Sequence, residues 1–87
     1  MIDRSKFSFA IIRFNQRTYV SGGVVAVVKG QVAAKRALKD FEETQSSEDR
    51  QEGWRYFLEE STLTPGMDTE QATKLRQLQF DRQESEV

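Results

Sequence analysis

The stretch Phe7-Ser-Phe-Ala-Ile-Ile-Arg-Phe14 decides the fold, because its aromatic and β-branched residues predict a strand near the start of the chain. The next two residues, Asn15-Gln16, predict a two-residue hairpin turn, since asparagine tolerates a positive φ. Residues 17–20 then return as a second strand, which places Arg17 opposite Phe14 and Tyr19 opposite Ile12. The rest of the chain must therefore pack on this hairpin.

A β-branched run from Val24 to Val28 follows a break at Ser21-Gly22-Gly23 and predicts a third strand. In the alternative reading the first helix begins at Val24 and tolerates Gly30, at about 1 kcal/mol relative to alanine. We favour the strand.

Two helices are expected next. Residues 31–44 have apolar side chains at helical spacing, namely Val32, Ala33, Ala37, Leu38 and Phe41. A second helix is predicted from an N-cap at Ser46-Ser47 to about Ser61, because Trp54, Phe57 and Leu58 would form one stripe along it.

The last part of the chain predicts a turn and a third helix. Thr64-Pro65-Gly66 has proline and glycine in the order that a type II turn prefers. Asp68 and Gln71 resemble a capping box that opens a helix running to about Arg82.

These elements predict an α+β fold, with an N-terminal antiparallel β-hairpin or three-stranded meander followed by about three helices. The 87 residues form a single small domain over residues 1–82, and the acidic tail 83–87 is expected to fray. A chain of this length buries roughly 60–65% of its unfolded surface. The thin core leaves room for a homodimer that completes it.

Charge is unevenly distributed along the chain. Residues 1–39 carry eight basic residues and one acid, a net charge of +7, whereas residues 40–87 carry thirteen acids and five basic residues, a net charge of −8. Such asymmetry between halves points to a charged partner. The acidic half can equally complement the basic half within one fold.

The composition favours a cytoplasmic protein without catalytic function. Cysteine is absent, and the apolar run that ends at Ile12 is too short for a signal peptide or a membrane span. Histidine is also absent, which removes the commonest general base and metal ligand. The glycines do not have the spacing of a phosphate-binding loop. We therefore expect no enzyme activity, no cofactor and no metal.

The basic half suggests one kind of partner. Arg13, Arg17 and Tyr19 on the hairpin, with Lys35, Arg36 and Lys39 on the first helix, have the residue types that bind phosphates and stack on bases. Against this, Phe14 and Tyr19 can pack beneath Trp54 and Phe57 in the core. Acids one turn away, Asp40 and Glu43, also partly neutralise the helix.

The acidic half suggests a protein partner. Aromatic side chains surrounded by charge are typical of interface hot spots. The residues expected to contact the partner are Glu48, Asp49, Glu52, Tyr56 and Glu59. The sequence thus favours a small regulatory or inhibitory protein of bacterial or phage type that binds another protein. The alternatives are a nucleic-acid-binding protein and an antitoxin-like protein that combines both surfaces.

Overall fold

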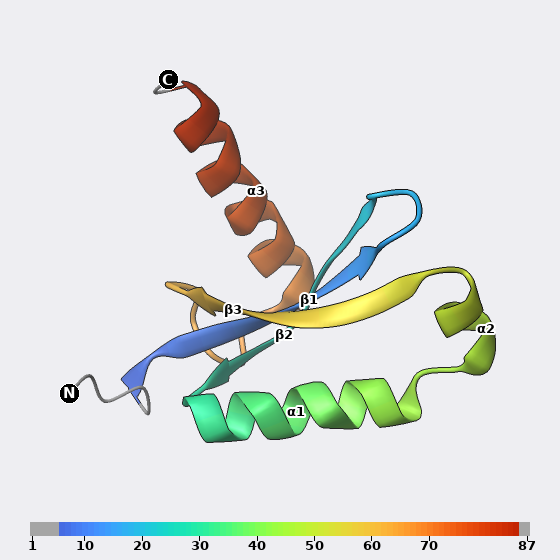
Figure 1. Ribbon diagram of the computed structural model, residues 1–87. Helices are drawn as coiled ribbons and strands as arrows, with labels where there is room; N and C mark the ends of the chain where they lie inside the picture. The colour runs from blue at the N-terminus through green and yellow to red at the C-terminus, as the bar shows by residue number, and fades with distance from the viewer. Residues whose placement is uncertain (1–5, 86–87) are drawn as a thin grey trace.

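The computed structural model describes residues 6–85, with residues 80–85 described by their backbone only. Three strands form one antiparallel sheet in the order β2-β1-β3, with α1 and α3 on opposite sides of it (Figure 1). The elements in chain order are β1 (Ser8–Asn15), β2 (Ser21–Lys29), α1 (Gln31–Thr44), α2 (Ser47–Gln51), β3 (Trp54–Ser61) and α3 (Thr69–Ser85). The α+β class is therefore confirmed.

The predicted order of strands followed by helices is only partly right, because a strand follows α1 and α2. Residues 54–61, which we expected in a helix, form β3 and pair with β1 along their whole length. Strand β1 thus lies in the centre, and the sheet is not a meander. The reason is that β1 has apolar side chains on both faces and is therefore buried, and its backbone N–H and C=O groups point to both edges. A second neighbouring strand completes the hydrogen bonding of these groups.

The hairpin also differs from the prediction. Residues 17–20 are not a strand but part of a longer loop, and β2 begins only at Ser21. Ile12 therefore pairs with Val24 rather than with Tyr19, and irregularities in the register accommodate the extra residues of β2. The run from Val24 to Val28 lies in β2, so the strand reading is confirmed over the helix reading.

The side chains of β1 alternate between two cores. Ala10 and Ile12 pack with Val24 and Val27 of β2 in a cluster that Leu63 and Ala72 complete. Phe9 and Ile11 are also buried and, by alternation, point to the opposite side, which α1 covers (Figure 1). Strand β1 thus contributes side chains to both cores and lies at the centre of the molecule.

The helix signals are largely confirmed. Helix α1 spans the predicted residues 31–44. Ser46 caps α2, since its Oγ accepts a hydrogen bond of 3.1 Å from the Asp49 N–H. Likewise the carboxylate of Asp68 accepts one of 3.1 Å from the Gln71 N–H at the start of α3.

The turn before α3 has the predicted type II form, with the Met67 N–H donating to the Thr64 carbonyl at 3.1 Å and Gly66 at φ 78°. Helix α3 runs to Ser85, beyond its expected end. The frayed tail 83–87 stays a prediction, and residues 86–87, like the N-terminal residues 1–5, lie outside the described residues. Within residues 6–85, no helix has the length and apolar content to cross a membrane.

Candidate functional site

The buried side chain of Asn15 ties two loops together at one end of the sheet. It is only 4% exposed, and its Nδ2 donates to the Glu52 carbonyl at 3.0 Å. Its Oδ1 accepts hydrogen bonds from the N–H groups of Arg17 at 2.9 Å and Thr18 at 3.1 Å. We call Asn15, together with Glu52 and Gly53, the Asn15 junction. It holds the β1–β2 loop, residues 16–20, against the turn between α2 and β3.

Glycine is required at position 53 of the junction. Gly53 has φ 101°, and a Cβ there would lie 2.8 Å from the Arg17 Cγ and 2.9 Å from the Asn15 Oδ1. The Gly53 carbonyl also accepts a hydrogen bond of 2.9 Å from the Gln16 N–H. The close approach of the two loops therefore depends on the missing side chain.

Loop 16–20 presents an exposed aromatic residue in a strained conformation. Tyr19 has φ 60°, the one positive φ among the described residues other than glycine, and it is 90% exposed. Hydrogen bonds of 2.8 Å hold it on both sides, from the Tyr19 N–H to the Asn15 carbonyl and from the Asn15 N–H to the Val20 carbonyl. Val20 is 54% exposed. The backbone beneath this large exposed side chain is thus held in a conformation that costs about 1–3 kcal/mol.

Arg13 and Asp49, which the sequence placed on different candidate surfaces, contact each other. The Arg13 Nη2 lies 2.6 Å from the Asp49 Oδ1, and the guanidinium stacks 3.8 Å from the centre of the Trp54 ring. Gln45 adds hydrogen bonds from its Nε2 to the other Asp49 oxygen at 3.2 Å and to the Trp54 carbonyl at 2.9 Å. These contacts fasten α2 to the sheet on the side of α1.

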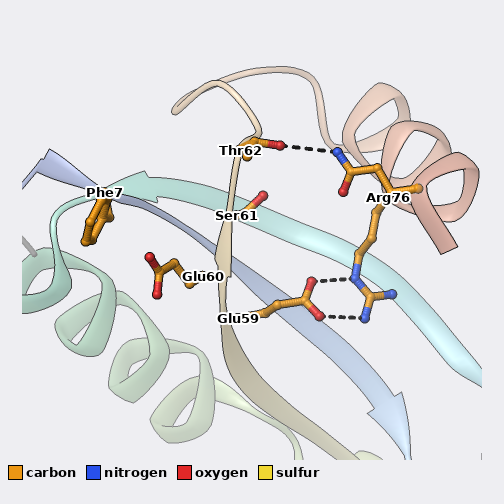
Figure 2. A pocket seen from close by; sticks show the side chains of 7 residues that line it. Phe7, Glu59, Glu60, Ser61, Thr62 and Arg76 are labelled. Carbon is orange, nitrogen blue, oxygen red and sulfur yellow. Dashed lines mark hydrogen bonds and ion pairs between the residues drawn. The ribbon is translucent and has the colours of Figure 1, made fainter. Parts of the chain in front are cut away.

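Two other predicted contact residues have internal partners. The ring of Tyr56 on β3 packs against Phe41 of α1, with centroids 5.3 Å apart. Glu59 accepts two hydrogen bonds from Arg76 of α3, at 2.7 and 3.1 Å, which bridge β3 to α3 (Figure 2). By contrast, Glu48 and Glu52 are exposed on and just after α2.

The bridge between Glu59 and Arg76 lies in a hollow of about 480 Å³ between β3 and α3 (Figure 2). Two more of its lining groups also bond to each other, since the Gln79 Nε2 donates to the Thr62 Oγ1 at 3.2 Å. The polar groups of the hollow thus stabilise the fold. Among the side chains that the structure describes, residues 6–79, no group of three acidic side chains is placed to hold a metal ion.

The predicted basic residues do not form one surface. Lys35, Arg36 and Lys39 are exposed on α1, where Lys39 lies 3.8 Å from Glu43 and Arg36 forms no ion pair with Asp40. Arg17 is exposed in loop 16–20, whose described hydrogen bonds reach the α2–β3 turn and not α1. Of the two aromatics that could pack beneath Trp54 and Phe57, Phe14 does contact Phe57, with centroids 5.2 Å apart, whereas Tyr19 is 90% exposed.

Asn15 and Gly53 were missing from the residues that the sequence proposed. The signal for Gly53 was its position inside an expected helix, where an isolated glycine argues for a break. Asn15 was interpreted only as a turn residue. The role of its buried amide can be recognised only when the loop after Asn15 is known to contain five residues. Comparison of the chain with protein-family models, with curated proteins and with solved structures finds no match.

Proposed function

We propose that this chain is a non-catalytic protein that binds another protein through loop 16–20 and the exposed acids of α2. Tyr19 carries the proposal: it is 90% exposed, and its positive φ is held by main-chain hydrogen bonds between Asn15 and residues 19 and 20. Strain of this kind persists where the surrounding structure enforces it, and it clusters at functional sites. The backbone that carries the Tyr19 side chain is already held by hydrogen bonds, so binding there costs little backbone entropy, which favours this side chain as an anchor.

The charges around Tyr19 favour a protein over a nucleic acid. The Arg17 side chain lies over Gly53, next to Glu52, and Glu48 is one helical turn before Glu52. A phosphate backbone would be repelled by these acids, whereas a protein surface with both signs of charge would complement them. Arg13, the cation of β1, is neutralised by Asp49.

Within this proposal, the contact residues are Arg17, Tyr19, Glu48 and Glu52. The other residues expected to contact a partner, Asp49, Tyr56 and Glu59, contact Arg13, Phe41 and Arg76 of the same chain instead. The role we propose is regulatory or inhibitory, in the cytoplasm, of the bacterial or phage inhibitor type. A small protein without catalytic machinery acts by occupying a surface on its partner.

The experiment is affinity capture of the partner from lysate of the cells that encode the chain, carried out with and without nuclease treatment. The wild type is compared with Tyr19→Ala and with Val32→Ala, a matched control because Val32 is 75% exposed on α1, away from the loop. We expect a stoichiometric protein that Val32→Ala retains and Tyr19→Ala loses by at least about tenfold, the ~1.4 kcal/mol of a moderate hot spot.

The result that would contradict the proposal is equally definite. Recovery of nucleic acid that elutes at moderate salt, and that Lys35→Glu and Arg36→Glu abolish, would establish the nucleic-acid alternative, because phosphate contacts release counterions. Retention of a protein partner by Tyr19→Ala would move the contact surface away from loop 16–20.

A further inference from the structure

The segment that carries α2 has no apolar side chain. Residues 45–52 read Gln45-Ser-Ser-Glu-Asp-Arg-Gln-Glu52, and no residue of α2 is buried. A helix of five residues is not stable by itself, because isolated helices need about 12–15 residues to form in water. Helices α1 and α3 bury Ala34 and Ala72 against the sheet, but α2 has no such side chain to bury. We call residues 45–52 the polar strap, and its attachment depends on polar contacts.

Asp49 is the centre of this attachment. Its Oδ1 lies 2.6 Å from the Arg13 Nη2, and its Oδ2 accepts a hydrogen bond of 3.2 Å from the Gln45 Nε2. The Gln45 Nε2 also donates to the Trp54 carbonyl at 2.9 Å. Among the described side chains, the bond between Arg13 and Asp49 is the one ion pair of the strap. Hydrogen bonds between two charged groups are about twice as strong as those between neutral groups.

The other attachments of the strap use backbone carbonyls. The Arg50 Nη2 donates to the Glu42 carbonyl at 3.3 Å, and the Arg55 Nη1 donates to the Arg50 carbonyl at 2.9 Å. At the end of the strap, the buried Asn15 side chain donates to the Glu52 carbonyl at 3.0 Å. The strap is thus fixed at its last residue by the Asn15 junction, while its middle is held chiefly through Asp49.

We propose that the polar strap is a conformational switch, which opens while the sheet, α1 and α3 stay folded, and that the contacts of Asp49 set how often it opens. The side chains of Arg13 and Asp49 are 27% and 24% exposed, so water reaches both groups when they separate. Opening uncovers no apolar side chain of the strap itself. Segments held by polar, partly exposed contacts are among the least stable units of a folded protein.

Opening changes the charges at this end of the molecule. With the strap closed, Arg13 is neutralised, and Glu48 lies one helical turn before Glu52. With the strap open, Arg13 is a free cation on the Trp54 ring, and Glu48 loses its fixed position. Salt screens the ion pair that closes the strap, so ionic strength shifts the balance between the two states. The opening does not rest on the proposed function: it is measured on the chain alone, whereas affinity capture tests the function separately.

The first test is amide hydrogen exchange of the isolated chain, followed by NMR. The strap reporters are the N–H groups of Arg50 and Glu52, which donate to the carbonyls of Ser46 at 3.2 Å and Glu48 at 3.0 Å. The reference is the N–H of the buried Ile11 in β1. We expect the strap reporters to be protected, at least about tenfold less than the reference, and insensitive to low urea, because local opening exposes little surface. Strap reporters without protection, or with the protection and urea dependence of the reference, overturn the proposal.

The second test compares two matched variants. Asp49→Asn and Glu48→Gln remove the same charge from the first turn of α2, but of the two residues only Asp49 contacts Arg13 and Gln45. Asp49→Asn should lower the protection of the strap reporters about fivefold, as expected for loss of a partly exposed ion pair. Glu48→Gln should lower it less than about twofold, since it changes only the interaction with the helix dipole. Equal effects of the two variants overturn the role of Asp49.

A core variant shows whether the opening is local. Ile12→Val removes a methylene group from the buried core and should lower the protection of the Ile11 reference about fivefold. The strap reporters should not change, because the core stays closed when the strap opens. Strap protection that falls together with the reference would show that the strap opens only by global unfolding, which overturns the proposal.

Salt is the last variable. Raising sodium chloride from about 0.02 to 0.5 M should lower the protection of the strap reporters about two- to threefold in the wild type and in Glu48→Gln. In Asp49→Asn the ion pair is already lost, so salt should have no such effect. A wild type that does not respond to salt, or an equal response of Asp49→Asn, refutes a switch controlled by this ion pair.

Discussion

Replacing Asn15 with alanine should destabilise the fold by about 2 kcal/mol. Its side chain makes three hydrogen bonds, one to the Glu52 carbonyl and two from the N–H groups of Arg17 and Thr18. At about 0.5–1.5 kcal/mol each, these bonds contribute about 1.5–4.5 kcal/mol. The two N–H groups lie in an exposed loop and regain hydrogen bonds to water in the variant, which places the loss toward the lower part of this range.

Urea unfolding monitored by the fluorescence of the single tryptophan measures this loss, because Trp54 directly follows the junction. For a domain of this size, about 2 kcal/mol corresponds to a fall in Tm of about 8–16 °C. Gln16→Ala is the control: its side chain is exposed and its backbone bond to Gly53 remains, so it should change stability by less than about 0.5 kcal/mol. If Asn15→Ala also costs less than about 0.5 kcal/mol, the junction does not hold the loops together.

Two further substitutions test the same end of the molecule. Gly53→Ala should lower the free energy of unfolding in urea by about 1–3 kcal/mol more than Gly66→Ala. Both glycines have positive φ, but of the two only position 53 would bring the Cβ against other atoms, among them the Asn15 Oδ1. Equal losses of stability would show that this contact is relieved without cost. In a double-mutant cycle of Arg13→Ala and Asp49→Ala, we expect a coupling of about 1 kcal/mol that decreases in high salt, since the two side chains are 27% and 24% exposed; a coupling near zero would mean that the ion pair does not fasten α2.

Sequence reasoning succeeded where short-range signals decide the structure. Helix α1, the Ser46 and Asp68 caps and the turn at Gly66 all depend on residues within a few positions of one another. In each case the neighbouring residues favour a single local structure. The strand at Val24 followed for the same reason, since a β-branched run between glycines is a strong local signal.

Sequence reasoning failed at residues 54–61, because the same residues fit both the periodicity of a helix and that of a strand. Trp54, Phe57 and Leu58 have helical spacing, yet Trp54, Tyr56 and Leu58 also alternate with residues of the opposite face. The choice is made by β1, whose free edge needs a partner strand far along the chain. Such non-local pairing leaves no signal in the segment itself.

The sequence predicted which residues belong to the proposed contact surface, but not how these residues are arranged in space. Arg17, Tyr19, Glu48 and Glu52 were all proposed as contact residues, but on two separate surfaces for two kinds of partner. The structure brings their segments together, because Asn15 reaches the Glu52 carbonyl across 37 positions of the chain. A hydrogen bond between two loops of irregular structure cannot be inferred from the pattern of either.

The segregation of charge bears on why a partner is expected at all. Two ion pairs of described side chains join the basic first half to the acidic second half, namely Arg13 with Asp49 and Lys39 with Glu43. The second of these spans one helical turn at the boundary and is largely exposed, so it contributes little. Charges of both halves are nevertheless exposed, among them Lys35 and Arg36 on α1 and Glu48 and Glu52 at α2. Exposed charges of this kind would orient the partner that we propose and accelerate its association.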